Sequence, residues 1–247
     1  MPNIEATKFY VRYQDGHPAS ENFDYARRGF DLQGVETVPF TSTEEINTLK
    51  DLGPTVGIAG YIGDVLKGLQ CLGKPLPEPL DYPPILKPYL GRNIRLGTLG
   101  EVVCSEEKVF VKPVQHKAFT GFVWQNDILA NRNIIGHSLE TPVWVSDPIV
   151  LLSEYRSFIL RGEILDVHRY KGCWGLAPSR SVLEEAVDEM TPHAPAAYCL
   201  DWGIAAWNET ILVEMNDGFS FGGYGLHPGY MSQMISARWY ELTGGSL

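Results

Sequence analysis

Several features that would narrow the class of this protein are missing from its 247 residues. No run of about 18 apolar residues is present, so no segment is predicted to cross a membrane. The N-terminal residues have neither the basic start nor the apolar core of a secretory signal, and we expect a cytoplasmic protein. Lys and Arg are scarce, 20 against 30 Asp and Glu, which gives a formal net charge of −10. This deficit of cations argues against nucleic-acid binding, because neutralising many phosphates needs an excess of them.

Common metal and nucleophile motifs are also missing. The four cysteines form no C-x-x-C pair, which predicts reduced thiols rather than a disulfide framework or a zinc site (Cys71, Cys104, Cys173 and Cys199). There is no G-x-S-x-G and no H-E-x-x-H. Residues 68–75 nearly match the phosphate-binding loop, but proline stands where that motif needs a hydroxyl for magnesium. We interpret this segment as a helix end capped by Gly73.

The first 73 residues alternate between strand-like and helix-like patterns. Strands are expected near residues 8–13, 35–38 and 55–59, which are rich in β-branched and aromatic side chains. Helices are expected over residues 22–32 (with Asn22 as cap), 42–52 (with a capping box at Ser42) and 65–72. This alternation predicts a small parallel α/β layer.

Six prolines between residues 75 and 88 favour an extended connector and mark a domain boundary. Beyond it the chain is mostly strand-like, at residues 109–111, 149–160, 163–168, 198–207 and 210–215. Helices are expected over residues 181–190 and 231–242. The predicted fold class is therefore an α+β region that follows a small α/β domain.

A lysine at the end of an apolar strand is the first candidate for binding phosphate. Lys112 follows three apolar residues, and Pro113 blocks further strand pairing. From such a rigid support an ammonium group can reach a bound phosphate. The next loop adds Lys117 and, at Thr120 and Gly121, backbone amides that can approach phosphate oxygens. Taken alone, a lysine exposed to solvent explains Lys112 better.

The second candidate segment is a short connector between two extended runs. Pro148 lies in this connector, and its backbone could act as a hinge that pairs with a purine edge. Arg156 follows on the next strand, and Arg169 lies in a stretch that again mixes cations with aromatic residues. The alternative for both arginines is surface ion pairing in an acidic protein.

The third segment carries the strongest signal. Two strands joined by a tight turn would bring Asp201 close to Glu214, and Asn216 shares a strand face with Glu214. Such hard oxygen ligands suit Mg²⁺ held together with nucleotide phosphates. Carboxylates packed this closely are unfavourable unless a cation lies between them. An acidic hairpin that faces solvent is the alternative, but it leaves the nearby cations unexplained.

The order of these segments resembles the ATP-grasp superfamily: a strand ending in Lys-Pro, a glycine-containing loop, a hinge, a Glu-x-Arg strand and a Glu-x-Asn strand. Residues 146–148, 153–156, 169–172 and 214–218 resemble the small clade named for two arginines and a lysine. The resemblance covers about residues 85–230. It implies an ATP-grasp fold, in which two α+β subdomains (residues 85–145 and 146–247) clasp ATP, preceded by a parallel α/β domain (residues 1–84).

The resemblance also implies roles for individual residues. Catalytic contacts to the transferred phosphoryl group would come from Arg156, Arg169 and Lys171. ATP would be bound by Lys112, Lys117 and Glu154 and by an adenine hinge made of Ser146, Asp147, Pro148 and Ile149. Lys87 is the nearest candidate for an earlier phosphate contact, with Arg92 and Arg95 as alternatives. Magnesium would be held by Asp201, Glu214 and Asn216, whereas Asp217 departs from the small residue or proline common in the superfamily.

The implied activity is ATP-dependent ligation of a carboxylate to an amine, through an acyl-phosphate, with release of ADP and phosphate. The substrates would be small molecules or peptides, contacted by the N-terminal domain and residues 224–230, and no motif identifies the acid or the amine. A homodimer is compatible with such a protein. Two alternatives stay open: a small-molecule kinase on the same fold, and a non-catalytic nucleotide-binding module.

Overall fold

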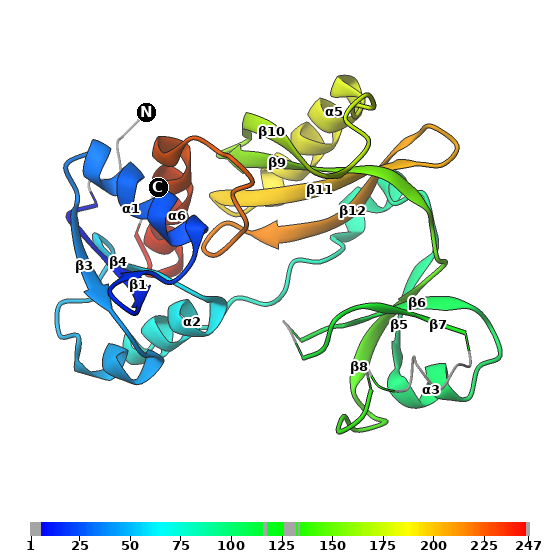
Figure 1. Ribbon diagram of the computed structural model, residues 1–247, viewed down its shortest axis with the longest axis horizontal. Coiled ribbons are helices and arrows are strands. Elements are labelled where there is room, and N and C mark those ends of the chain that lie inside the picture. The colour runs from blue at the N-terminus through cyan, green and yellow to red at the C-terminus, as the bar shows by residue number, and fades with distance from the viewer. Residues whose placement is uncertain (1–5, 116–117, 126–131, 133, 246–247) are drawn as a thin grey trace.

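The chain folds around three four-stranded β-sheets in the part that its computed structural model describes, residues 6–115, 118–125, 132 and 134–245 (Figure 1). We call them the N-terminal sheet, the small sheet and the large sheet. Within these residues no helix is both long and apolar enough to cross a membrane.

In the N-terminal sheet, β1 (Lys8–Gln14) pairs in parallel with β3 (Glu36–Phe40) and with β4 (Val56–Ala59), and antiparallel with β2 (His17–Pro18). Helices α1 (Glu21–Leu32) and α2 (Ile62–Cys71) belong to the same unit. They are joined by α6 (Pro228–Leu242), which packs against α1 although it comes from the other end of the chain (Figure 1). The small parallel α/β layer predicted from the sequence is therefore confirmed, and the two ends of the chain share one core.

The start of α1 differs from the prediction. Ser20, not Asn22, caps the helix, because its hydroxyl accepts the Phe23 N–H. Asn22 lies inside the first turn, where its Oδ1 accepts the Gly223 N–H at 2.9 Å. The expected capping residue instead holds a glycine-rich loop against the N-terminal unit.

The helix predicted over residues 42–52 is only the short 3₁₀-helix η1 (Thr43–Thr48). Ser42 accepts the Glu45 N–H, as a capping residue should, but the chain becomes extended at Leu49. Two residues later, the Asp51 carboxylate is bound by the side chains of Lys8 and Tyr10 on β1. These tertiary contacts outweigh the local preference for helix.

After α2 the chain leaves the N-terminal unit through the proline-rich connector. Gly73 adopts a φ of +65° and the Lys74 N–H bonds back to the Leu69 carbonyl at 2.9 Å, which confirms the predicted helix end. The connector leads to the 3₁₀-helix η2 (Pro84–Tyr89).

The small sheet is antiparallel, with the strand order β5 (Ile94–Thr98), β8 (Pro142–Ser146), β6 (Val109–Pro113) and β7 (Phe122–Trp124). Helix α3 (Leu99–Val103) covers one face. Val109, Val111, Val143 and Val145 are buried on that face, so Lys112 and Trp144 point to the other face.

The large sheet is also antiparallel, with the order β10 (Glu163–Gly172), β9 (Leu151–Leu160), β11 (Ala197–Ala205) and β12 (Thr210–Asp217). Helix α5 (Arg180–Met190) and η2 pack on one face, which we call the α5 face, and the 3₁₀-helix η3 (Thr191–His193) follows α5. Tyr155 and Leu200 are buried there. Alternation along the strands places Arg156 and Asp201 on the opposite face, the site face. The predicted divisions at residues 84/85 and 145/146 stay predictions.

Candidate active site

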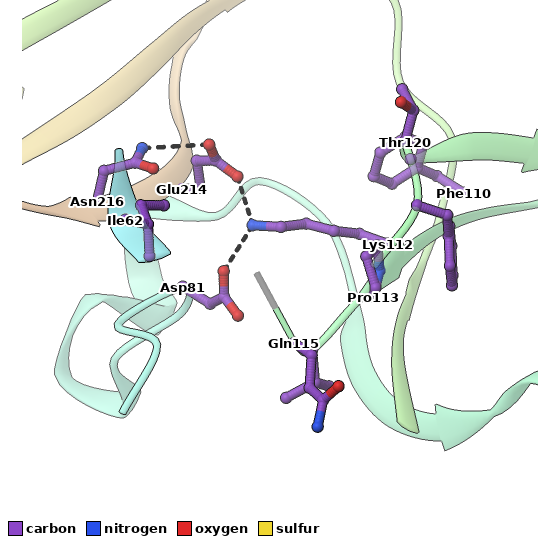
Figure 2. Close-up of a pocket in the computed structure, with 12 residues that line it drawn as sticks. Ile62, Asp81, Phe110, Lys112, Pro113, Gln115, Thr120, Glu214 and Asn216 are labelled. Carbon is purple, nitrogen blue, oxygen red and sulfur yellow. Dashed lines mark hydrogen bonds and ion pairs between the residues drawn. The ribbon is translucent and has the colours of Figure 1, made fainter. Parts of the chain in front are cut away.

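A cavity of about 630 Å³ lies between the small sheet, β12 and the start of α2, a size that suits a small ligand (Figure 2). Its walls mix apolar side chains with a few charged and polar ones. The lining residues are Ile62, Asp81, Phe110, Lys112, Pro113, Val114, Gln115, Phe119, Thr120, Gly121, Glu214 and Asn216. The strand-end lysine and two of the three predicted magnesium ligands therefore share one cavity.

Lys112 crosses from the small sheet to the large sheet. Its Nζ donates to Glu214 Oε2 at 2.5 Å and to Asp81 Oδ1 at 2.6 Å (Figure 2). Burial lowers the pKa of Lys112, but the charges of Glu214 and Asp81 outweigh it and raise the pKa above its ordinary value. Lys112 is thus a partly buried, charged group at the cavity, and the solvent-exposed alternative is excluded.

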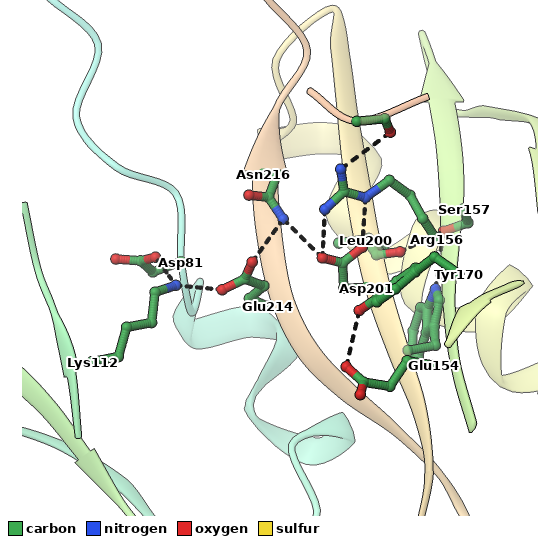
Figure 3. Close-up of polar contacts among 12 residues, drawn as sticks. Asp81, Lys112, Glu154, Arg156, Ser157, Tyr170, Leu200, Asp201, Glu214 and Asn216 are labelled. Carbon is green, nitrogen blue, oxygen red and sulfur yellow. Dashed lines mark hydrogen bonds and ion pairs between the residues drawn. The ribbon is translucent and has the colours of Figure 1, made fainter. Parts of the chain in front are cut away.

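The three predicted magnesium ligands lie together, as Figure 3 shows. Asp201 on β11 and Glu214 on β12 are directly opposite each other in the strand register. The Asn216 Nδ2 donates to Asp201 Oδ2 and to Glu214 Oε1, at 3.1 Å in both cases. The hairpin that joins the strands turns at Asn208, whose φ of +68° an asparagine tolerates.

Arg156 completes this network from β9. Its Nε and Nη2 donate to the two oxygens of Asp201 at 2.6 Å each, and its Nη1 donates to the Gly222 carbonyl at 3.3 Å. The guanidinium also lies 5.1 Å from the centre of the Tyr224 ring. Both ions are almost fully buried, so each satisfies a charge that would be unfavourable alone.

The donor set of the hairpin fits Mg²⁺. Two carboxylates and a carboxamide offer the oxygen ligands that this ion prefers. No group of three or more His, Cys, Asp or Glu side chains is arranged to hold a metal anywhere in the described residues. The candidate site therefore depends on the amide of Asn216. Burial acts to raise the pKa of Glu214, but Lys112 outweighs it and lowers that pKa, so this ligand is ionised.

The predicted adenine hinge connects β8 to β9. Ser146 is buried at the end of β8. The backbone N–H of Asp147 donates to the Asn93 carbonyl, and its carboxylate accepts from the backbone and the side chain of Asn93. None of Ser146, Asp147, Pro148 and Ile149 lines the 630 Å³ cavity.

Glu154 and Lys171 meet on adjacent strands at the edge of the site face. Lys171 Nζ donates to Glu154 Oε1 at 2.6 Å, and the Tyr170 hydroxyl donates to Glu154 Oε2 at 3.2 Å. The Tyr170 ring stacks on Tyr224, 4.7 Å between centroids, and Tyr224 in turn covers Arg156. Glu154 is thereby linked to the network through two aromatic rings, whereas Lys171 is largely exposed.

Arg169 is not brought to this network. It is opposite Tyr155 in the strand register, and the Tyr155 side chain packs in the core beneath α5. Cross-strand partners share a face, so Arg169 lies on the α5 face, away from Arg156. Its guanidinium is exposed and donates to the Gly172 carbonyl at 2.7 Å. The sequence pattern did not reveal this difference in face.

The candidates for an earlier phosphate contact also lie outside the cavity lining. Lys87 is exposed on η2, which packs against α5. Arg92 donates to the carbonyls of Leu90, Leu212 and Val213, and Arg95 pairs with Glu101. Lys117 lies outside the described residues.

Asp81 is a site residue that the sequence analysis missed. It lies in the proline-rich connector, belongs to no motif and comes 31 positions before Lys112. Only the fold brings the two together. An acidic residue among prolines was the one available signal.

Known proteins share this architecture. A family model matches residues 89–234, and it describes an ATP-grasp domain, family 2 of the clade named for two arginines and a lysine. Comparison with curated proteins gives no match. A D-alanine–D-alanine ligase from Bacillus anthracis complexed with ATP has a similar fold, with a TM-score of 0.60, 13% identity, and coverage of 98% of this chain and 97% of that one.

Two further solved structures show the same likeness. The D-cycloserine synthetase DcsG has a TM-score of 0.58 and 11% identity, with 94% of this chain and 99% of that chain covered. The macrocyclase MdnC, bound with precursor peptide MdnA from Microcystis aeruginosa MRC, has a TM-score of 0.53 and 12% identity, with 97% and 100% covered. At such identities the likeness concerns the fold, and the matched domain gives the family. The chain belongs to the ATP-grasp superfamily, in the clade named for two arginines and a lysine.

Proposed function

We propose that the chain is an ATP-dependent ligase that joins a carboxylate to an amine and releases ADP and phosphate. One observation carries this proposal. Lys112, Glu214, Asn216, Asp201 and Arg156, which come from four strands of two sheets, form one connected network beside a ligand-sized cavity (Figure 3). The similar folds of ligases that act on amino acids, or that were solved with a precursor peptide, support small-molecule or peptide substrates.

The chemistry needs no side-chain nucleophile. An oxygen of the substrate carboxylate attacks the terminal phosphorus of ATP, and the bond from that phosphorus to the ADP oxygen breaks, which leaves an acyl-phosphate. The amine nitrogen then attacks the acyl carbon, the bond from that carbon to the phosphate oxygen breaks, and the amine loses a proton. Both steps depend on positioning and on compensating phosphate charge.

The network divides this work among its members. Lys112 places a cation at the cavity, where it would neutralise phosphate oxygens. Asp201, Glu214 and Asn216 would hold Mg²⁺, which supplies further neutralisation of phosphate charge when bound. Arg156 holds both oxygens of Asp201 and so fixes that carboxylate beside Asn216. A direct contact from Arg156 to the transferred phosphoryl group would first require this ion pair to open.

A substrate screen tests the proposal. Pairs of amino acids and short peptides are incubated with ATP and Mg²⁺, ADP release is measured, and products are identified by mass spectrometry. Replacing the amine with hydroxylamine should trap the acyl-phosphate as a hydroxamate. Glu214→Gln should abolish turnover, whereas Glu209→Gln, the same change at the exposed turn of the same hairpin, should not.

The other activities would give different results. A kinase would accumulate a phosphorylated product that hydroxylamine leaves unchanged. A non-catalytic module would bind ATP without releasing ADP with any pair. Normal turnover by Glu214→Gln would remove this hairpin from the proposed metal site.

A further inference from the structure

Asp81 connects two parts of the protein that are far apart along the chain. Its backbone belongs with the large sheet, because the Met215 N–H of β12 donates to the Asp81 carbonyl at 2.8 Å in an isolated antiparallel bridge. Its φ of +34° is a left-handed value that an aspartate tolerates. The residue is buried although it lies in a connector. The connector is therefore fixed to β12 at this point.

The Asp81 side chain, in contrast, binds the small sheet. One oxygen accepts the Lys112 ammonium at 2.6 Å, and the other accepts the Trp144 indole N–H at 2.8 Å. Lys112 and Trp144 are opposite each other on β6 and β8. The next residue, Tyr82, packs edge-on against Trp144 and lies 5.3 Å from the Lys112 ammonium.

Lys112 thus has two carboxylate partners, Asp81 and Glu214 (Figure 2). Glu214 belongs to the candidate metal set, and a ligand bound there would compete with Lys112 for its carboxylate. Asp81 accepts from side chains of the small sheet and stays available to Lys112. With Asp81 present, Lys112 keeps its charge compensation and its direction when the bond to Glu214 is exchanged.

We propose that Asp81 is a positioning residue that holds the Lys112 ammonium at the cavity and couples the small sheet to the large sheet through it. This role rests on the proposed nucleotide site, but its first test needs no turnover. It predicts that loss of Asp81 loosens the small sheet relative to the large sheet, and that this effect depends on Lys112.

Two native thiols allow the coupling to be measured. Cys104 follows α3 on the small sheet and Cys173 follows β10 on the large sheet; both are exposed, whereas Cys199 is buried. In a Cys71→Ser background, spin labels on Cys104 and Cys173 report the distance between the sheets in nucleotide-free protein. Asp81→Asn and Lys112→Met should each broaden the distance distribution. The double variant should be no broader than the broader single variant, because both changes delete one link.

Matched variants separate this role from a general loss of packing. Asp51→Asn removes a more exposed ion pair to Lys8 and should leave the distribution unchanged. Trp144→Phe deletes the other bond to Asp81 and should broaden it less than Asp81→Asn. An unchanged distribution in Asp81→Asn, additive broadening in the double variant, or equal broadening by Trp144→Phe would overturn the proposal.

A binding measurement tests the positioning of Lys112 itself. Calorimetric titration with a non-hydrolysable ATP analogue and Mg²⁺ should show about fivefold or greater loss of affinity in Asp81→Asn. In a Lys112→Met background the same change should cause no further loss. Unchanged or tighter binding by Asp81→Asn, or an equal loss in both backgrounds, would show that Asp81 does not act through Lys112. Neither result would decide whether the protein is a ligase.

Discussion

Arg238 on α6 binds both carboxylate oxygens of Asp217 at the end of β12, with Nε–Oδ1 and Nη2–Oδ2 distances of 2.7 and 2.6 Å. Asp217 directly follows the Asn216 of the candidate metal site and is the residue at which the sequence departs from the superfamily. The pair explains this departure, because it fixes the metal-site strand to a helix that packs in the N-terminal core.

The first prediction concerns this pair. Arg238→Met should lower the free energy of unfolding by about 3–5 kcal/mol, because it leaves Asp217 buried and unpaired. The double variant Arg238→Met/Asp217→Leu should recover most of that loss. Arg180→Met, which removes an exposed pair with Glu184 on α5, should change stability by less than about 1 kcal/mol. Urea unfolding monitored by circular dichroism measures all three, and a small effect of Arg238→Met would mean that the pair is structurally dispensable.

The two arginines of the sequence pattern provide the second prediction. Arg156→Met should reduce ADP release by about 10²-fold or more, because Asp201 loses both of its charged hydrogen bonds. Arg169→Met should change the rate by less than about threefold, since its side chain lies on the α5 face. Steady-state kinetics on folded variants, checked by thermal melting, distinguishes the two. A comparable loss in Arg169→Met would restore the phosphoryl contact that the resemblance implied.

The third prediction concerns the backbone at the end of β10. Gly172 has a φ of +86°, and a Cβ placed there would lie 2.3 Å from the Leu152 carbonyl oxygen. Gly172→Ala should therefore destabilise the fold by about 1–3 kcal/mol. Gly63→Ala, in α2 with nothing within 4 Å of the added Cβ, should be neutral or stabilising by up to about 1 kcal/mol. Urea unfolding of the two variants compares them, and equal effects would argue against strain at Gly172.

Much of the fold and part of the site follow from local sequence. The strands of the large sheet, and the convergence of Asp201, Glu214 and Asn216, follow from period-2 alternation around a tight turn. The face of Arg169 did not follow, because it depends on how β10 is registered against β9 and on irregularities in that pairing. Asp81 could not be found locally, since its role depends on a contact 31 residues away. Local patterns specify elements, whereas register and long-range contacts determine which side chains meet.

The fourth prediction concerns the cysteines. Cys71, Cys104 and Cys173 are exposed, whereas Cys199 on β11 is fully buried and burial raises its thiol pKa. The thiolate is the reactive form, so a disulfide reagent at neutral pH should titrate the three exposed thiols in the native protein and all four in denaturant. Cys199→Ser should leave the native count unchanged. Because Cys199 is opposite Asn216 in the strand register, rapid reaction of a fourth native thiol would show that the hairpin of the candidate metal site opens in solution.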